Sequence, residues 1–173
     1  VDGTEYPAVW TRFSDDELKS FGLTWENPPA RSEPYNTKFY SGRKNDGTLI
    51  EHSLTNVNVV DDDGKAIIDP TTGKQMVQLG LKAIWVEKTK QTAQGRLNKH
   101  DWMITRKAEK GTEIPSDVTT YRDAIRTKCA QIEASINNCS NLKEFMALFD
   151  VPLDSEGNPT GDNPPIFDFP NEI

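Results

Sequence analysis

The chain lacks several features that would place it in a specialised class of protein. It contains no run of about eighteen apolar residues, and its N-terminal residues do not pair a basic stretch with an apolar one, so we expect neither a membrane span nor a secretory signal. Apolar residues make up only 35% of the 173 residues, below the usual share. We therefore expect a soluble protein of one domain, with a modest core and extended segments around it.

Cysteine is also scarce, and the two examples are Cys129 and Cys139. If one helix reaches both, their Cα atoms lie roughly 15 Å apart at the rise of an α-helix, whereas a disulfide requires about 7 Å or less. We therefore interpret both as free thiols in a reducing compartment, with Cys129 as a small core residue.

No serine elbow, HExxH, CxxC or phosphate-binding glycine loop occurs in the sequence. His100 and Asp101 are adjacent, but neighbouring residues point in different directions on any regular element. We expect Asp101 to accept hydrogen bonds from free backbone N–H groups where a helix has ended, and Trp102 to pack between that helix and the next. A catalytic or ligand role for the pair is the alternative. No enzyme activity, metal site or cofactor is predicted.

The net charge of −7 is unevenly distributed. Residues 82–110 carry eight Lys/Arg and three Asp/Glu, whereas residues 150–173 carry six acids and no base. The two regions either dock, within one chain or between copies, or form two solvated faces. Nucleic-acid binding is disfavoured because the protein is acidic and Trp85 and Trp102 are better explained as core residues.

Residues 1–43 are predicted to form a short helix followed by an extended arm. Ser14 and Glu17 have the spacing of a capping box, and Gly22 stands where a helix C-terminus favours a left-handed residue. The following prolines, which include Pro28 and Pro29, favour an extended arm, with Trp25 and Tyr35 as its anchors.

Residues 44–149 are predicted to form the folded body, with strands at about 48–87 and helices at about 88–99, 117–137 and 142–149. The turn sequences DDDGK and DPTTGK separate runs of branched residues; a calcium loop starting at Asp61 fails because Ala66 and Thr72 occupy its glycine and bidentate-acid positions. A stripe with a repeat near 3.5 residues packs either within the chain or as the seam of an oligomer. Its members are Val118, Tyr121, Ile125, Cys129, Ile132 and Ile136.

Residues 150–173 are rich in proline, glycine and acids, and are predicted to form an extended tail. The aromatic and apolar residues near its end indicate a peptide that docks in a groove elsewhere, and a frayed terminus is the alternative. Those residues are Pro164, Pro165, Ile166, Phe167 and Phe169. The sequence as a whole predicts an α+β fold: a small antiparallel sheet or hairpins, then a helical hairpin, with extended Pro-rich arms at both ends.

A helix that ends in a His/Thr-Asp-Trp step, a variable spacer, a proline and a helix containing Tyr-Arg-x-x-Ile-Arg together resemble a unit of tailed-bacteriophage tail proteins. The opening residues, with Tyr6-Pro7 and Trp10, are similar to the start of many small phage tail proteins, and NTKFY and GLKAIWVEKTKQTA are similar to members from contractile-tailed phages of marine cyanobacteria. The resemblance covers most of residues 5–149. The residues that carry its central unit are Leu97, Asp101, Trp102, Pro115, Tyr121, Arg122, Ile125 and Arg126.

This resemblance implies a non-enzymatic virion structural protein, made in the host cytoplasm and located in the tail. It would be an adaptor or small fibre subunit of the tail or baseplate, with other tail, baseplate or fibre proteins and further copies of itself as partners, and with no membrane or nucleic acid. Its two extended arms would hold it in place. The alternatives are a tail-fibre assembly chaperone that leaves the particle, and an unrelated small binding module or enzyme.

Overall fold

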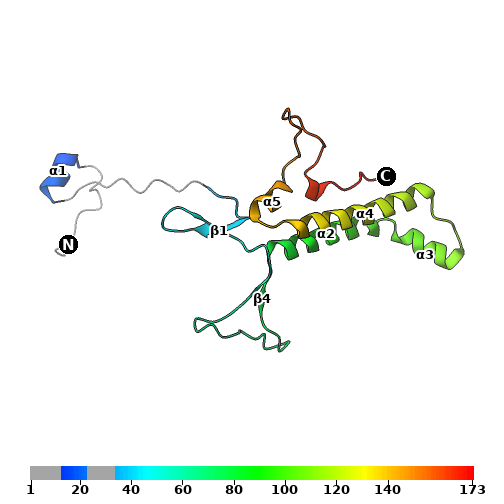
Figure 1. The fold of residues 1–173 in the computed structure, drawn as a ribbon, viewed down its shortest axis with the longest axis horizontal. Coiled ribbons are helices and arrows are strands. Elements are labelled where there is room, and N and C mark those ends of the chain that lie inside the picture. Colours follow the sequence, from blue (N-terminus) through cyan, green and yellow to red (C-terminus); the bar gives the residue numbers. More distant parts are fainter. Residues whose placement is uncertain (1–12, 23–33) are drawn as a thin grey trace. The chain divides into compact units, whose positions relative to one another are not determined.

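The computed structural model of the chain describes residues 13–22 and 34–173. The chain divides into two compact units, Val1–Pro34 and Tyr35–Ile173. The second unit contains every helix and strand of the described residues except the first helix (Figure 1). Small antiparallel strand pairs and several helices make it up, which confirms the predicted α+β fold.

The described part of the first unit is centred on a short helix, α1 (Asp15–Ser20). The Ser14 hydroxyl accepts a hydrogen bond from the Glu17 backbone N–H at 3.4 Å, and the Glu17 carboxylate accepts one from the Ser14 N–H at 2.8 Å. This is the predicted capping box. The hydrogen bonds from Ser14 lower the pKa of the Glu17 carboxyl, and Gly22 follows the helix with a φ of +74°.

The second unit begins with an antiparallel hairpin of β1 (Tyr40–Arg43) and β2 (Leu49–Glu51). Lys44 donates from its backbone N–H to the Thr48 carbonyl at 2.8 Å and closes the turn between them. Phe39, just before β1, is buried in the core and anchors the hairpin to the helices.

A second antiparallel pair follows, formed by β3 (Val57–Asn58) and β4 (Val77–Gln78). After β4 the chain comes back beside the residue that precedes β3, where the Gly80 N–H donates to the Asn56 side-chain oxygen at 3.0 Å. A Cβ on Gly80 would lie 2.3 Å from the carbonyl carbon of Thr55, so only glycine permits this approach. The segment between these ends stands away from the helices (Figure 1).

The helix α2 (Leu81–Asn98) starts at the residue after Gly80. The predicted strand region at about 48–87 is therefore wrong from Leu81 onward, and the helix predicted at about 88–99 begins seven residues earlier. The branched residues Ile84 and Val86 favour a strand locally. Leu81, Thr89 and Ala93 are nevertheless all buried, at a helical spacing, and packing of this face decides the conformation.

Two further helices complete the helical hairpin. The helix α3 (Asp101–Lys110) replaces the predicted spacer, and Gly111 ends it with a φ of +66°. The helix α4 (Ser116–Asn138) then runs alongside α2 (Figure 1), within one or two residues of its predicted bounds. Every residue of the predicted stripe on α4 is buried, and the stripe packs within the chain rather than as an oligomer seam.

The short helix α5 (Leu142–Ala147) follows, with the Asn141 side chain accepting from the Glu144 N–H at 2.9 Å. Phe145 is fully buried, and its ring centroid lies 5.4 Å from that of Phe149. These rings, with Phe39 and Trp85, form an aromatic cluster where α2, α5 and the β1–β2 hairpin meet. The last element is a 3₁₀ turn, η2 (Pro165–Phe167).

Candidate functional site

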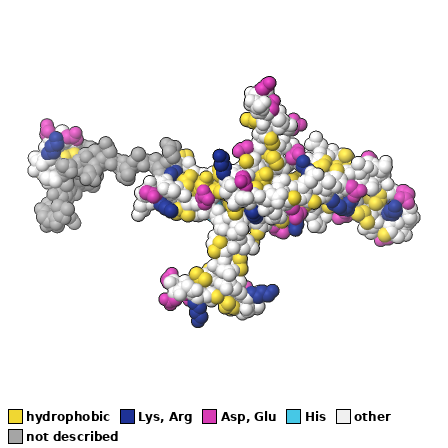
Figure 2. All heavy atoms as spheres, viewed as in Figure 1, with side chains coloured by type: hydrophobic (Ala, Val, Ile, Leu, Met, Phe, Trp, Pro, Cys, Tyr) yellow, Lys and Arg dark blue, Asp and Glu magenta, His cyan; other side chains and the backbone are white. Residues whose placement is uncertain are grey.

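Exposed apolar side chains gather on the segment from Val57 to Leu79. We call this segment the arm from here on, as distinct from the terminal segments 1–43 and 150–173. It holds seven of the fourteen large hydrophobic side chains that are exposed among the described residues, and Figure 2 shows hydrophobic atoms along this projection. These side chains are 36–56% exposed, and a gathering of exposed apolar side chains marks interaction sites. The seven are Val57, Val60, Ile67, Ile68, Met76, Val77 and Leu79.

The arm holds these side chains on a hydrogen-bonded scaffold of three short segments. The Val59 N–H donates to Met76 at 2.9 Å, the Ile67 N–H donates to Val59 at 3.1 Å, and the Met76 N–H donates to Ile67 at 2.8 Å, each to the backbone carbonyl. Asp61 and Asp69 accept backbone hydrogen bonds inside the two turns, and those from Thr71 and Thr72 lower the pKa of Asp69. The turns fix the display of the apolar side chains.

A groove runs along one flank of α2, starting at the root of the arm. Two adjoining hollows share Trp85 and Lys88, and together they make up this α2 groove. The Lys88 ammonium lies 4.4 Å from the centroid of the Trp85 ring, and the Lys38 ammonium lies 5.5 Å from it. Aromatic faces and cations therefore stand together, an arrangement that favours apolar groups flanked by anionic ones. The apolar lining also includes Leu79, Leu81, Ile84 and Phe167.

The C-terminal tail folds back onto α2 and α4 of its own chain. Ile166 and Phe169 are 3% and 6% exposed and belong to the core. The Arg96 guanidinium donates to the Pro170 carbonyl at 2.6 Å, and Lys99 pairs with Glu172 at 2.5 Å. The structure thus corrects the prediction that Ile166 and Phe169 dock in a groove on another protein, because helices of the same chain already bury them.

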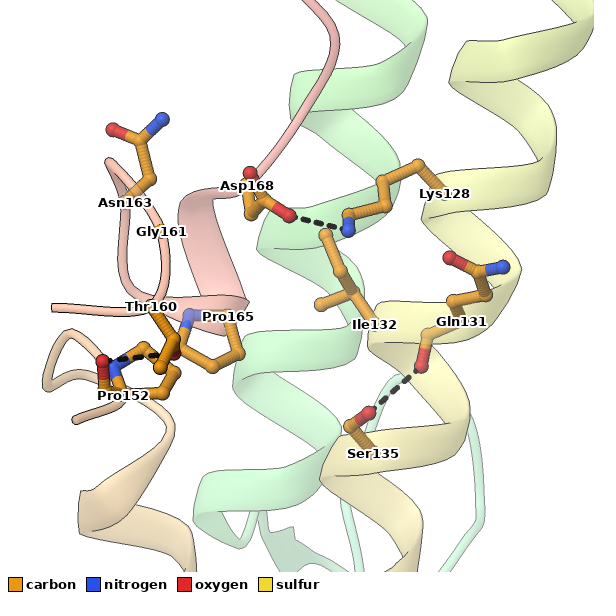
Figure 3. A pocket seen from close by; sticks show the side chains of 10 residues that line it. All are labelled: Lys128, Gln131, Ile132, Ser135, Pro152, Thr160, Gly161, Asn163, Pro165 and Asp168. Carbon is orange, nitrogen blue, oxygen red and sulfur yellow. Dashed lines mark hydrogen bonds and ion pairs between the residues drawn. The ribbon is translucent and has the colours of Figure 1, made fainter. Parts of the chain in front are cut away.

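A cleft between α4 and the tail illustrates this docking (Figure 3). Lys128 and Gln131 line it from α4, and Thr160, Asn163 and Asp168 line it from the tail. The Lys128 ammonium pairs with the Asp168 carboxylate across the cleft. The Lys99–Glu172 ion pair joins the basic stretch 82–110 to the acidic tail within one chain, which is one of the arrangements that the charge distribution predicted.

The other predicted interface residues differ in their exposure to solvent. Trp25, Pro28 and Pro29 lie outside the described residues. Tyr35, Pro164 and Pro165 are half-buried, whereas Phe167 is 48% exposed and its ring centroid lies 6.1 Å from that of Trp85. Of the predicted tail interface, Phe167 thus remains open to solvent and contributes to the α2 groove.

The Asp-Trp step begins a helix, and within the described residues the Asp101 carboxylate accepts from a side chain rather than from the free backbone N–H groups that we expected. Asp101 is the first residue of α3, and its carboxylate accepts from the Arg122 guanidinium at 2.8 Å. Trp102 is 53% exposed, with the Arg106 guanidinium 4.9 Å from its ring centroid. The prediction that Trp102 packs between two helices is wrong because it lies on a solvent-facing side of α3, a helix with no buried residue.

Arg122 joins the ends of two helices. Its guanidinium donates to the Leu97 carbonyl at 2.7 Å, in the last turn of α2, and to Asp101 at the start of α3. Arg122 is only 6% exposed, whereas Arg126, which pairs with Asp123 at 2.9 Å, is half exposed. Pro115 precedes α4 directly, as predicted. The sequence unit that prompted the resemblance therefore has a structural role in orienting α2, α3 and α4.

Substitution Asp101→Ala is expected to lower the free energy of unfolding by about 1–3 kcal/mol, because the buried Arg122 guanidinium loses its carboxylate partner. The matched control is Asp123→Ala, which removes the exposed pair with Arg126 and costs about 0–1 kcal/mol. Urea unfolding monitored by circular dichroism measures both values. Equal effects of the two substitutions would contradict the structural role of Arg122.

His100 does not form a pair with Asp101. Its ring packs edge-on against the Tyr121 ring, with centroids 5.7 Å apart, while the Asp101 carboxylate faces Arg122. The His100 Nδ1 atom and the Tyr121 hydroxyl are buried and have no hydrogen-bond partner among the described residues. The divergence expected of neighbouring residues is therefore observed.

Both cysteines are free and buried. Burial and a hydrogen bond from the thiol to the Glu133 carboxylate raise the pKa of Cys129 to about 11, and burial also raises the pKa of Cys139. Since the thiolate is the reactive form, we expect neither thiol to react appreciably with an aromatic disulfide reagent at pH 8 until the chain is unfolded in urea. Rapid reaction of either thiol in the folded protein would contradict its burial.

The arm was missed by sequence reasoning as an exposed element. Its runs of branched residues between turn sequences predicted strands of the folded body, and nothing local indicated that these side chains would be exposed. The sequence does contain one indication of exposure, which is the short length of the predicted strands. Two turn sequences within residues 61–74 leave strands too short to build a sheet with its own core.

None of the described helices is long and apolar enough to cross a membrane. Across residues 13–22 and 34–173, no group of three or more His, Cys, Asp or Glu side chains is placed to hold a metal ion. Comparison of the chain with protein-family models, with curated proteins and with solved structures found no match.

Proposed function

We propose that the chain is a non-enzymatic structural protein of a tailed-bacteriophage virion, serving as an adaptor or small fibre subunit of the tail or baseplate. The proposal originates in the resemblance of the helix–Asp-Trp–helix unit to tail proteins. The observation that supports it most directly is the arm, with seven exposed large apolar side chains on one segment.

Apolar surface exposed to water raises the free energy of the protein. Burial of apolar surface stabilises an association by about 25 cal/mol per Å², so the arm favours a state in which another protein covers it. The arm's hydrogen bonds hold its shape without help from the helices, and little ordering cost opposes docking. Such an element suits a permanent position in a particle.

The attachment site in this proposal differs from the one that sequence patterns favoured. The terminal segments 1–43 and 150–173 were the expected anchors, but in the second of them Ile166 and Phe169 are core residues of the same chain. The arm replaces them as the main attachment surface. The α2 groove beside Trp85 and Phe167 provides a second exposed surface on the same unit.

Quantitative mass spectrometry of purified phage particles tests this function. We expect the chain at a constant, near-whole-number ratio to the other tail proteins after repeated density-gradient purification. Abundance in infected cells with absence from the particles would contradict the structural role and favour a tail-fibre assembly chaperone. Binding of a small ligand or metal ion that raises the melting temperature would favour an unrelated binding module.

A further inference from the structure

The arm ends in an acidic tip, and the α2 groove is basic. The turn at residues 61–65 holds three aspartates and one lysine, and it directly follows Val60, which is 50% exposed and pairs with Ala66 across the turn. The groove is lined by Lys38, Lys88 and Arg96, and by no Asp or Glu among the described residues. In a chain with a net charge of −7, this local positive charge is set apart from the rest.

The charged groups on both surfaces are available. Lys38 and Lys88 contact aromatic rings, and within the described residues neither ammonium pairs with a carboxylate. On the arm, Asp61 is engaged by the backbone N–H groups of Asp63 and Lys65. The exposed carboxylates of Asp62 and Asp63 remain for a partner.

The apolar parts of the two surfaces also match. The groove presents Ile84, Trp85 and Phe167 beside its cations, and the arm presents the exposed β-branched side chain of Val60 beside its acidic turn. Charge and polarity thus agree.

We propose that the arm tip of one copy docks in the α2 groove of a second copy, with Asp62 and Asp63 facing Lys38 and Lys88. The backbone hydrogen bonds of residues 59–76 stay within the arm, so among the described residues the tip has no backbone partner outside the arm. Because the two surfaces differ, the contact is head-to-tail, and its repetition produces a ring or an open filament. This inference goes beyond the proposed function and does not depend on it.

Charge reversal at each surface tests the pairing. Sedimentation velocity of the full chain at low salt is expected to show concentration-dependent association, weakened at least about tenfold by Lys38→Glu with Lys88→Glu, or by Asp62→Lys with Asp63→Lys. The chain that carries all four substitutions is expected to regain association, because its charges are exchanged rather than removed. A wild-type chain that stays monomeric up to about 1 mM, or a quadruple variant no better than the double variants, would overturn the proposal.

A mixing experiment tests the head-to-tail geometry. Val60→Asn with Ile68→Asn disables the arm and leaves the groove intact, whereas Lys38→Glu with Lys88→Glu disables the groove and leaves the arm intact. Each variant alone is expected to be monomeric, and an equimolar mixture is expected to form a one-to-one dimer that grows no further. Formation of that dimer also shows that both variants fold. A mixture that stays monomeric, or either variant dimerising alone, would overturn the proposed contact.

Discussion

Truncation after Phe149 is expected to lower the free energy of unfolding by roughly 3–6 kcal/mol. The removed segment carries Ile166 and Phe169, both buried in the core, and burial of one such side chain contributes about 1.5–3 kcal/mol. It also removes the partners of Arg96 and Lys128. Urea unfolding measures the loss. The tail is thus part of the fold, although its composition is typical of a disordered segment.

Phe169→Ala and Phe167→Ala remove the same type of side chain from a buried and an exposed position, so comparing them isolates the effect of burial. The two residues lie two positions apart, but Phe169 is 6% exposed and Phe167 is 48% exposed. The first substitution is expected to cost about 3–5 kcal/mol and the second about 1 kcal/mol. Truncation after Pro170, which removes only the exposed Glu172 ion pair with Lys99, is expected to cost less than about 1 kcal/mol. A truncation after Phe149 that leaves stability unchanged would contradict docking of the tail.

Excision of the arm, unlike truncation of the tail, is expected to leave the fold intact and to abolish association. Val57 and Gln78 are paired partners in the β3–β4 ladder, so an Asn-Gly turn in place of residues 58–77 joins the strands at a natural position. No residue of the arm belongs to the buried core cluster. We therefore expect the free energy of unfolding to change by less than about 1 kcal/mol.

The excised chain is also expected to lose part of its binding of a fluorescent dye specific for exposed apolar surface, since five of the fourteen exposed large hydrophobic side chains of the described residues lie on the excised segment. Fluorescence titration measures this loss. The control is the intact arm with Val60, Ile68 and Met76 replaced by Thr, which keeps the scaffold and removes much of the apolar surface. An excised chain that unfolds cooperatively but binds the dye as strongly as the wild type would contradict the assignment of the apolar surface to the arm.

Sequence patterns located the helices with strong periodicity. The stripe from Val118 to Ile136 specified α4, and Ser14 with Glu17 specified the start of α1, because both signals depend on spacing along one element. The start of α2 was missed because Ile84, Trp85 and Val86 favour a strand when considered alone. Only the packing of Leu81 and Ala93 against the rest of the core selects the helix.

Which side chains are exposed and which are buried was harder to predict. Trp102 was expected in the core because of its size, yet α3 has no buried face. Ile166 and Phe169 were expected to dock on another protein because their segment has too few apolar residues to fold alone, yet helices of the same chain supply the surface that buries them. Both outcomes depend on which tertiary surface lies opposite a side chain, and no local pattern contains that information.

The most direct test of the account is competition between the intact chain and the arm-excised chain for places in the particle. Both are produced together in infected cells, and the ratio of their distinguishing peptides is measured in cells and in purified particles. Attachment through the arm predicts that the excised chain is depleted in particles by roughly tenfold or more, equivalent to about 1.4 kcal/mol of lost binding. Equal ratios in cells and in particles would contradict it.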